Sequence, residues 1–330
     1  MRRVILVPLI IVGVALFAYF LVKLPWHEAV LVVTEANPLT MLAYLFLSVL
    51  IKILLAWRWQ VILQAKKITI PFRNAVAYRF ASAAVSFVAP GPRVGGDAVA
   101  AAMLQRHQTK QQPISFSKAL STVLIDRSVE VQAFAALFFL GVLYLAWHGD
   151  IPAALRVLMV GGSIVLLALM VLFAVNTAHG KPFLTRLVRR FSKNPVFQKH
   201  VSEFEHTLVT FYKEDKKEFV VSHLISAAAW FVSLIEYKCL LLVLGYDAPL
   251  YAIFIVYSFI GLAYLVPIPL ALGSLEGSQA AAFSLLGLSA ALGVVLALLT
   301  RLRDVIFTVA GFMVLVYYGF TPRKTPQPIR

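Results

Sequence analysis

Long apolar stretches dominate the chain and set its predicted elements. A helix needs about 20 mostly apolar residues to cross a bilayer. Six stretches meet this requirement and predict membrane-spanning helices at 4–22, 38–57, 117–146, 152–175, 219–244 and 290–319. The first follows two arginines, as in a signal peptide. However, no small-residue cleavage site comes after it, so we interpret it as an uncleaved helix.

Two further apolar stretches, 72–90 and 250–266, each run into a segment rich in Pro and Gly. Pro and Gly at this density break a helix. Broken backbone at membrane depth persists only where protein or a wet cavity satisfies its polar groups. We therefore predict re-entrant helical hairpins at 72–105 and 250–288. Two full spans at each place are the alternative, and they leave the sidedness of the other helices unchanged.

The basic residues predict which side each loop occupies. The stretch 176–218 carries nine Lys or Arg, whereas 23–37 carries only Lys23, and 147–151 and 245–275 carry none. Loops rich in Lys and Arg stay in the cytoplasm. Six spans with both termini in the cytoplasm satisfy this rule, and we expect the chain in a bacterial inner membrane.

Residues 176–218 also contain a helical pattern. Apolar side chains recur at steps of four and three residues, which places them on one face of a helix. They are Phe197, Val201, Phe204, Leu208 and Phe211. Such a helix lies either on the membrane surface or against the cytoplasmic face of the protein itself.

Landmarks of the first half recur in the second. Pro90 recurs as Pro267, Asp97 as Glu276 and Arg127 as Arg303, at separations of 177, 179 and 176 residues. By the charge rule the long helix 117–146 runs outward and its counterpart 290–319 runs inward, so the repeat is inverted. Inverted repeats with broken helices are typical of transporters. Chance recurrence of Pro and Gly is the alternative.

We thus predict an all-α integral membrane protein, built as an inverted repeat of transmembrane helices with two re-entrant hairpins. Residues 1–330 form a single membrane domain. It has a first repeat at about 38–146, a connector helix and cytoplasmic loop at 152–218, and a second repeat at about 219–319.

Charged residues lie in the middle of two predicted spans. An unpaired charge at the bilayer centre costs about 2.5–3.5 kcal/mol on insertion scales, so these groups must pair or line water. The spacing predicts the pairs Arg127–Glu130 and Arg301–Asp304 on shared helix faces. Asp126 and Glu130 need a cation between them, for which an arginine of the other long helix is the natural candidate. The charges form either a structural lock or a phosphate-binding pocket.

In the inverted repeat, Arg127 and Arg303 are expected to converge near the pseudo-twofold axis. Gly-rich breaks would add free backbone N–H groups that favour anions. Asp97 and Glu276 follow the breaks and serve either the site or as helix caps. The candidate substrate-binding residues are Arg58, Arg93, Gly95, Gly96, Asp97, Asp126, Arg127, Glu130, Gly273, Glu276, Arg301, Arg303 and Asp304.

Composition excludes several function classes. The chain has 330 residues, 61% of them hydrophobic, a formal net charge of +15 and a mean hydropathy of +0.85. Its bases lie in loops beside apolar runs, which indicates contact with anionic lipid headgroups rather than with nucleic acid. Cys239 is the only cysteine, so no intrachain disulfide forms. Metalloprotease, P-loop and nucleophile-elbow motifs are missing, and we expect no metal and no cofactor.

Several motifs together resemble a known family. Trp57-Arg58-Trp59, Gly95-Gly96-Asp97, Asp126-Arg127, Pro267-x-Pro269, Gly273-x-x-Glu276 and Arg303 look like the flippase-like membrane domain of bacterial lysylphosphatidylglycerol synthases and its stand-alone relatives. The likeness covers about residues 38–319. Residues 93–97 and 126–130 are most similar to members encoded with hopanoid biosynthesis genes.

Two departures from that family limit what the resemblance implies. We expect no soluble aminoacyl-transferase domain after residue 330, so lipid lysylation is not implied. Gly273-Ser274-Leu275-Glu276 also replaces the more usual Gly-Leu-Gly-x-x-Glu of the family. The resemblance implies translocation of a membrane lipid, which we expect to be anionic, and leaves the particular lipid open.

Three functions follow from these observations. The leading hypothesis is a lipid flippase or transporter with its headgroup site at the repeat interface. The second is a membrane-embedded enzyme that acts on a lipid, with Asp97 and Glu276 as acid and base. The third is a scaffold that holds lipid-synthesis enzymes through residues 176–218.

Overall fold

The computed structural model describes residues 15, 17–20, 22, 26–89, 94–107, 114–148, 153–180, 183–192, 194–266 and 268–318. Within these ranges the chain folds into helices without a β-strand. They are α2 (Trp26–Thr34), α3 (Pro38–Ala65), α4 (Phe72–Val88), α5 (Val94–Arg106), α6 (Phe116–His148), α7 (Ala153–Ala178), α8 (Phe183–Phe191), α9 (Pro195–Lys213), α10 (Lys216–Val243), α11 (Leu250–Leu265), η1 (Pro269–Ala271), α12 (Ser274–Leu285) and α13 (Ala290–Tyr317). The predicted all-α class is confirmed. Most of the first predicted span, 4–22, lies outside the described residues.

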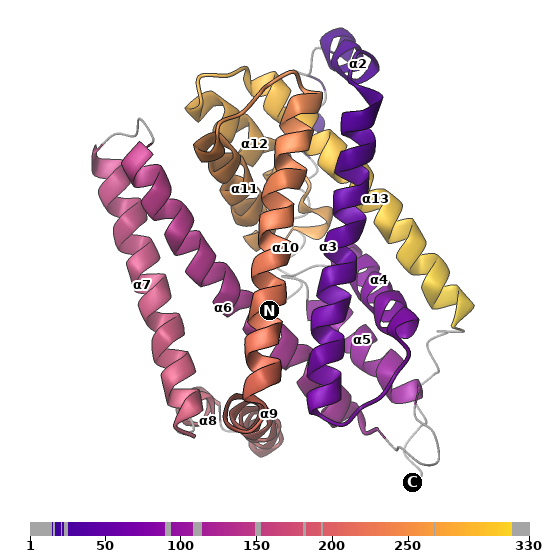
Figure 1. Ribbon diagram of the computed structural model, residues 1–330, viewed down its shortest axis with the longest axis vertical. Coiled ribbons are helices and arrows are strands. Elements are labelled where there is room, and N and C mark those ends of the chain that lie inside the picture. Colours follow the sequence, from indigo (N-terminus) through magenta and orange to yellow (C-terminus); the bar gives the residue numbers. More distant parts are fainter. Residues whose placement is uncertain are drawn as a thin grey trace.

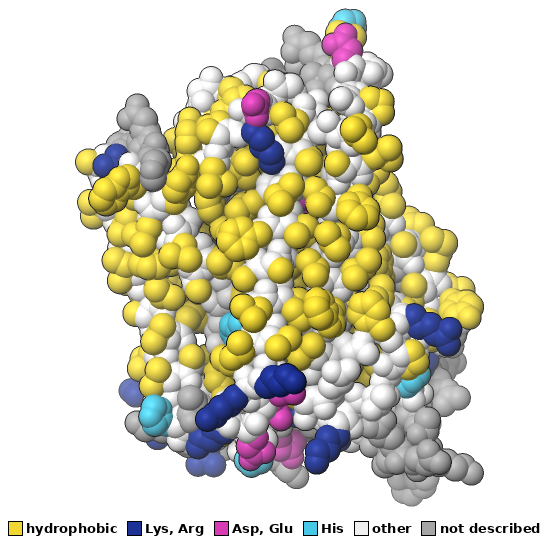
Figure 2. Space-filling model, in the orientation of Figure 1, with side chains coloured by type: hydrophobic (Ala, Val, Ile, Leu, Met, Phe, Trp, Pro, Cys, Tyr) yellow, Lys and Arg dark blue, Asp and Glu magenta, His cyan; other side chains and the backbone are white. Residues whose placement is uncertain are grey.

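Four of the described helices are long and apolar enough to cross a bilayer. They cover Pro38–Ala65, Phe116–Trp147, Arg156–Thr177 and Lys216–Val243. On the face shown in Figure 2, hydrophobic side chains cover the middle of the molecule, and Lys and Arg gather towards its lower end. Exposed apolar side chains include Phe46 on α3, Val157 on α7 and Phe231 on α10. The chain is a multi-pass membrane protein.

Helix α13 has 28 residues, as many as α3 and α10, yet it differs from the four spans in its centre. Three charged residues, Arg301, Arg303 and Asp304, interrupt its apolar sequence. All three side chains are at least partly buried and ion-paired. A helix of this length reaches about 42 Å, enough to cross the hydrocarbon core.

The two Pro- and Gly-rich segments interrupt helices where the sequence predicted. Helix α4 ends at Val88 and α5 begins at Val94, and α11 and α12 flank the short η1 turn. In Figure 1, α4 and α5 lie in the lower half of the molecule, whereas α11 and α12 lie in the upper half. Each pair therefore forms a hairpin, and the two hairpins lie towards opposite ends. Their re-entrant placement in a bilayer stays a prediction.

The halves repeat one order of elements with similar lengths. Helices α3, α4, α5 and α6 have 28, 17, 13 and 33 residues, and α10, α11, α12 and α13 have 28, 16, 12 and 28. Helices α3 and α10 pack against each other and run in opposite directions (Figure 1). This order agrees with the predicted repeat, although its inverted symmetry remains a prediction.

Glycines let the helices of the hairpins approach closely. A Cβ on Gly96 of α5 would lie 2.0 Å from the carbonyl oxygen of Ser82 on α4. A Cβ on Gly293 of α13 would lie 2.3 Å from the carbonyl oxygen of Gln279 on α12, and one on Gly311 would lie 2.3 Å from that of Phe80. Small residues are the usual means of close helix packing in membranes. The contact at Gly311 joins α13 of the second half to α4 of the first.

The predicted amphipathic helix corresponds to α9. Leu208 and Phe211 are completely buried and cluster with Ile62 of α3 and Ile125 of α6. The side chain of Phe197 lies outside the described residues. The C-terminal part of the apolar face therefore packs against the protein itself, which was the second of the two alternatives, and not on a membrane surface.

Candidate functional site

Two groups of ion-paired side chains lie in the two halves. The first-half cluster joins α3, α4, α5 and α6 and comprises Arg58, Arg79, Asp97, Asp126, Arg127 and Glu130. The second-half cluster joins α10, α12 and α13 and comprises Glu236, Glu276, Arg301, Arg303 and Asp304. Each carboxylate in both clusters has an arginine partner, as buried charges require.

Arg58 is the centre of the first-half cluster, and only 1% of its side chain is exposed. Its Nε and Nη2 donate to the two oxygens of Asp126 at 2.7 and 2.9 Å, and Nη2 also donates to Glu130 Oε2 at 2.9 Å. Nη1 donates to Ser226 Oγ of α10 at 3.1 Å. The cation between Asp126 and Glu130 is thus Arg58 of α3. The expectation that it comes from the other long helix was wrong.

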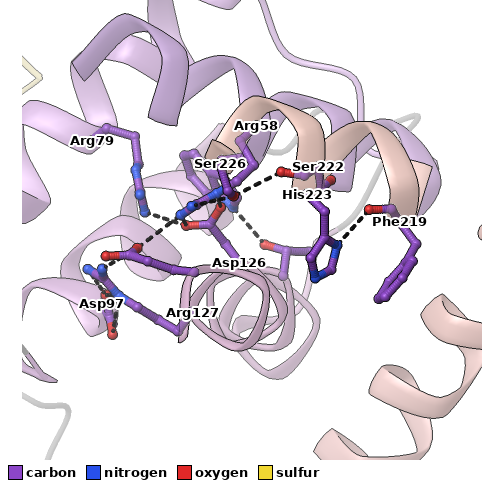
Figure 3. Close-up of polar contacts among 12 residues, drawn as sticks. Arg58, Arg79, Asp97, Asp126, Arg127, Phe219, Ser222, His223 and Ser226 are labelled. Carbon is purple, nitrogen blue, oxygen red and sulfur yellow. Dashed lines mark hydrogen bonds and ion pairs between the residues drawn. The ribbon is translucent and has the colours of Figure 1, made fainter. Parts of the chain in front are cut away.

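Arg79 of α4 approaches Asp126 from the other side, as Figure 3 shows. Its Nη1 lies 3.0 Å from Asp126 Oδ2, and the side chain is 9% exposed. Within the part of the chain that the structure describes, this nitrogen makes no hydrogen bond. Because Arg58 already donates to both oxygens of Asp126, Arg79 contributes charge to the cluster while part of its donor capacity is unused.

Arg127 of α6 ties the first hairpin to the long helix (Figure 3). Its Nε and Nη2 donate to Asp97 Oδ1 at 3.1 and 3.0 Å, and Nη1 donates to Glu130 Oε2 at 2.9 Å. The predicted pair of Arg127 with Glu130 is confirmed. Asp97 lies in the first turn of α5, so it both faces the positive end of that helix and anchors Arg127.

Arg301 of α13 holds the second hairpin in an equivalent way. Its Nε and Nη2 donate to Glu276 Oε1 at 2.9 and 2.5 Å. Its Nη1 donates to the carbonyl oxygen of Leu270 at 2.6 Å. Leu270 and Ala271 have φ angles of 59° and 49°, a conformation that non-glycine residues rarely adopt. Strained backbone of this kind is concentrated at functional sites.

Glu276 has a second role at the start of α12. Its Oε2 accepts a hydrogen bond from the Gly273 N–H at 2.8 Å, and Gly273 has a φ angle of 73°. The expected free N–H at this break is therefore already used. On the first hairpin, the Cα of Gly96 packs against α4, while Gly95 is exposed. Arg93 lies outside the described residues.

Arg303 joins α13 to α10. Its Nη1 donates to Glu236 Oε1 at 2.6 Å, and its Nε and Nη2 donate to Asp304 Oδ1 at 3.1 and 2.9 Å. Asp304 also accepts a hydrogen bond from the Tyr264 hydroxyl at 2.7 Å. The predicted pair of Arg301 with Asp304 was wrong. Arg301 binds Glu276 of α12, and Asp304 binds Arg303, its neighbour in the chain.

A cavity of about 140 Å³ lies between the two clusters. Arg79, Arg127 and Glu130 of the first-half cluster line it, together with Asp304 of the second. Lys52 of α3, Tyr264 of α11 and the strained tip of the second hairpin also line it. No described interaction joins Arg127 to Arg303, and each binds carboxylates of its own half. Arg127 lines the cavity and Arg303 does not, so the expected convergence of the two arginines stays a prediction.

The sequence missed several of these residues. Arg79 lies within the hairpin predicted at 72–105 but was not among the candidate site residues, and it is largely buried in α4. Glu236 and Lys52 lie in apolar helices, and a charge in such a helix is the signal that could have found them. Within the described ranges, no three His, Cys, Asp or Glu side chains come together as metal ligands.

Comparisons with known proteins identify the family of the chain. The sequence model of the family described as the lysylphosphatidylglycerol synthase TM region matches residues 5–311. A UPF0104 membrane protein of Pyrococcus horikoshii is 24% identical over 312 residues, covering 89% of this chain and 91% of that protein. Another, of Methanothermobacter thermautotrophicus, is 22% identical over 325 residues, covering 94% and 95%. The chain belongs to the family of the lysylphosphatidylglycerol synthase transmembrane region.

Proposed function

We propose that this protein moves a phosphate-bearing membrane lipid between leaflets, with the lipid headgroup bound in the cavity between the two clusters. The observation that carries the proposal is the position of this cavity. It lies where ion-paired residues of both halves meet, beside the strained tip of a broken helix. Arginine binds phosphate through two parallel hydrogen bonds, so the cavity offers the donors that a headgroup needs.

The ion pairs suggest how binding is coupled to movement. Arg127 holds Asp97 at the start of α5, and Arg301 holds Glu276 at the start of α12. A phosphate that takes donors from Arg127 competes with the carboxylate of Asp97. Binding then weakens the tie between a hairpin and its long helix. A ligand shifts a conformational equilibrium only by such differential affinity, so this competition links headgroup recognition to alternating access.

The direct test is reconstitution into vesicles with a trace of lipid that carries a fluorescent label on an acyl chain. A membrane-impermeant reductant added outside quenches the outer leaflet only. We expect vesicles with the protein to lose nearly all fluorescence, because inner-leaflet lipid reaches the outside. Loss equal to that of protein-free vesicles contradicts the proposal, and chemical conversion of the lipid by purified protein supports the enzyme alternative.

We further propose the topology that the basic residues predict, with both termini and α8–α9 in the cytoplasm of a bacterial inner membrane. Ser192 lies between α8 and α9 and offers a labelling site. In a Cys239→Ala background, Ser192→Cys should resist a membrane-impermeant thiol reagent in intact cells and react after lysis. Ready labelling in intact cells contradicts this sidedness.

A further inference from the structure

The wall of the cavity carries both signs of charge. Lys52, Arg79 and Arg127 supply cations, and Glu130 and Asp304 supply carboxylates. The cations Arg79 and Arg127 come from α4 and α6 of the first half, and Asp304 comes from α13 of the second. A site for a plain anion needs only the cations. A wall with both signs suits a ligand that itself carries a positive and a negative group.

The clusters and the cavity wall are also neutral as a whole. The cations are Lys52, Arg58, Arg79, Arg127, Arg301 and Arg303, and the carboxylates are Asp97, Asp126, Glu130, Glu236, Glu276 and Asp304. Among the residues that the structure describes, six cations thus balance six carboxylates. A monoanionic headgroup would leave one uncompensated negative charge in a region of low dielectric, where it is unfavourable. A headgroup without net charge avoids this cost.

The positive side of the cavity can accept a phosphate. The Arg79 side chain is 9% exposed, and its one ion pair among the described residues is with Asp126, which Arg58 already holds with two hydrogen bonds. Buried arginine nitrogens without an acceptor are unfavourable. A phosphate oxygen in the cavity would provide the missing acceptor, with Arg127 as its neighbour on the wall.

Asp304, which the second half contributes to the wall, can accept an ammonium. Asp304 Oδ2 accepts the Tyr264 hydroxyl, and Oδ1 accepts two N–H groups of Arg303. An ionised carboxylate has about four acceptor positions, so Oδ2 retains one for a ligand. The cavity volume of about 140 Å³ is below the ~300 Å³ of sites for drug-sized molecules, so it holds a headgroup and not the acyl chains.

We propose that the cavity selects a zwitterionic phospholipid headgroup, with its phosphate on Arg79 and Arg127 and its ammonium on Asp304. This inference rests on the proposed function and replaces the expectation of an anionic lipid. Phosphatidylethanolamine is the simplest lipid of this chemistry, and phosphatidylglycerol is a matched lipid that has the phosphate without the ammonium.

The test compares acyl-labelled phosphatidylethanolamine and phosphatidylglycerol in the vesicle assay. We expect wild-type protein to move phosphatidylethanolamine about tenfold faster than phosphatidylglycerol. A factor of ten corresponds to the free energy of about one charge-assisted hydrogen bond. Equal rates, or faster movement of phosphatidylglycerol, overturn the selectivity while lipid translocation itself stands. Movement of neither lipid contradicts the proposed function instead.

Two variants test which residues bind the phosphate and which residue binds the ammonium. Asp304→Asn gives the site a net positive charge. It should therefore lower the rate of phosphatidylethanolamine translocation and raise the ratio of the phosphatidylglycerol rate to the phosphatidylethanolamine rate. The control Asp247→Asn changes an exposed carboxylate and should keep the wild-type preference. Arg79→Gln should slow both lipids, whereas Arg73→Gln, exposed on the same helix, should not. An unchanged preference in folded Asp304→Asn, checked by thermal unfolding, overturns the proposal.

A membrane potential gives an independent readout. Movement of a zwitterion transfers no net charge, so the wild-type rate for phosphatidylethanolamine should not change when a potassium diffusion potential is imposed. Movement of an anion would accelerate or slow according to the sign of the potential. A clear dependence on the potential for phosphatidylethanolamine contradicts a headgroup carried as a neutral unit.

Discussion

The two clusters use arginine differently. In the first half, Arg58, Arg79 and Arg127 come from three helices and meet the carboxylates of α5 and α6. In the second half, both arginines are on α13, and Arg301 also binds backbone carbonyl oxygens at the hairpin tip. The first-half cluster therefore locks whole helices together, whereas the second-half cluster supports a strained turn.

One pair of equivalent positions shows how this difference arises. Arg58 lies 20 residues after the start of α3, and Glu236 lies 20 residues after the start of α10. Arg58 binds Asp126, and Glu236 binds Arg303. The corresponding helices α3 and α10 thus each contribute one member of a buried ion pair. That member is the cation in the first half and the carboxylate in the second. Neither Arg58 nor Glu236 lines the shared cavity, so this reversal concerns how each half is held together.

The largest effect is expected from the centre of the first-half cluster. Arg58→Ala leaves Asp126 and Glu130 without their main partner, and breaking a buried pair in this way costs about 3–5 kcal/mol. Lys238→Ala removes an exposed pair with Asp247 and should cost less than about 1 kcal/mol. Unfolding in detergent measures both. Similar stability of the two variants would mean that Arg58 is not a lock.

A smaller effect is expected at the close contacts of the hairpins. Gly96→Ala places a Cβ against the Ser82 carbonyl oxygen, and Gly293→Ala does the same at Gln279. Overpacking of this kind costs about 1–3 kcal/mol. Gly161→Ala on α7 meets no atom within 4 Å and should stabilise by about 0.5–1 kcal/mol. Loss of stability in Gly161→Ala alone would contradict the packing described here.

The smallest effect on stability is expected from the acids that begin the hairpins' second helices. Glu276→Gln should cost more than Asp97→Asn, because Glu276 is fully buried and also accepts from Gly273. We expect about 1–3 kcal/mol for the former and about 1 kcal/mol for the latter. Both should reduce lipid translocation more than the yield of folded protein. Equal losses of lipid translocation and of folded protein would indicate that Asp97 and Glu276 only cap their helices.

The sequence predicted where the helices are interrupted, because Pro and Gly act locally on the backbone. It also located the buried arginines of α6 and α13, since a charge in an apolar stretch needs no tertiary information to be noticed. Partner choice was harder. Whether Arg301 binds Asp304 or Glu276 depends on how α12 packs against α13. Arg79 was missed because its contact with Asp126 depends on how α4 and α6 are placed relative to each other.

The most direct test of the account compares Arg127→Lys and Arg303→Lys in the vesicle assay. Lysine keeps the charge but loses the planar fork that binds a carboxylate and a phosphate through two hydrogen bonds. We expect both variants to fold and to move lipid about tenfold more slowly than the wild type, the equivalent of one charge-assisted hydrogen bond. Wild-type rates in both variants would contradict a headgroup site between the two clusters.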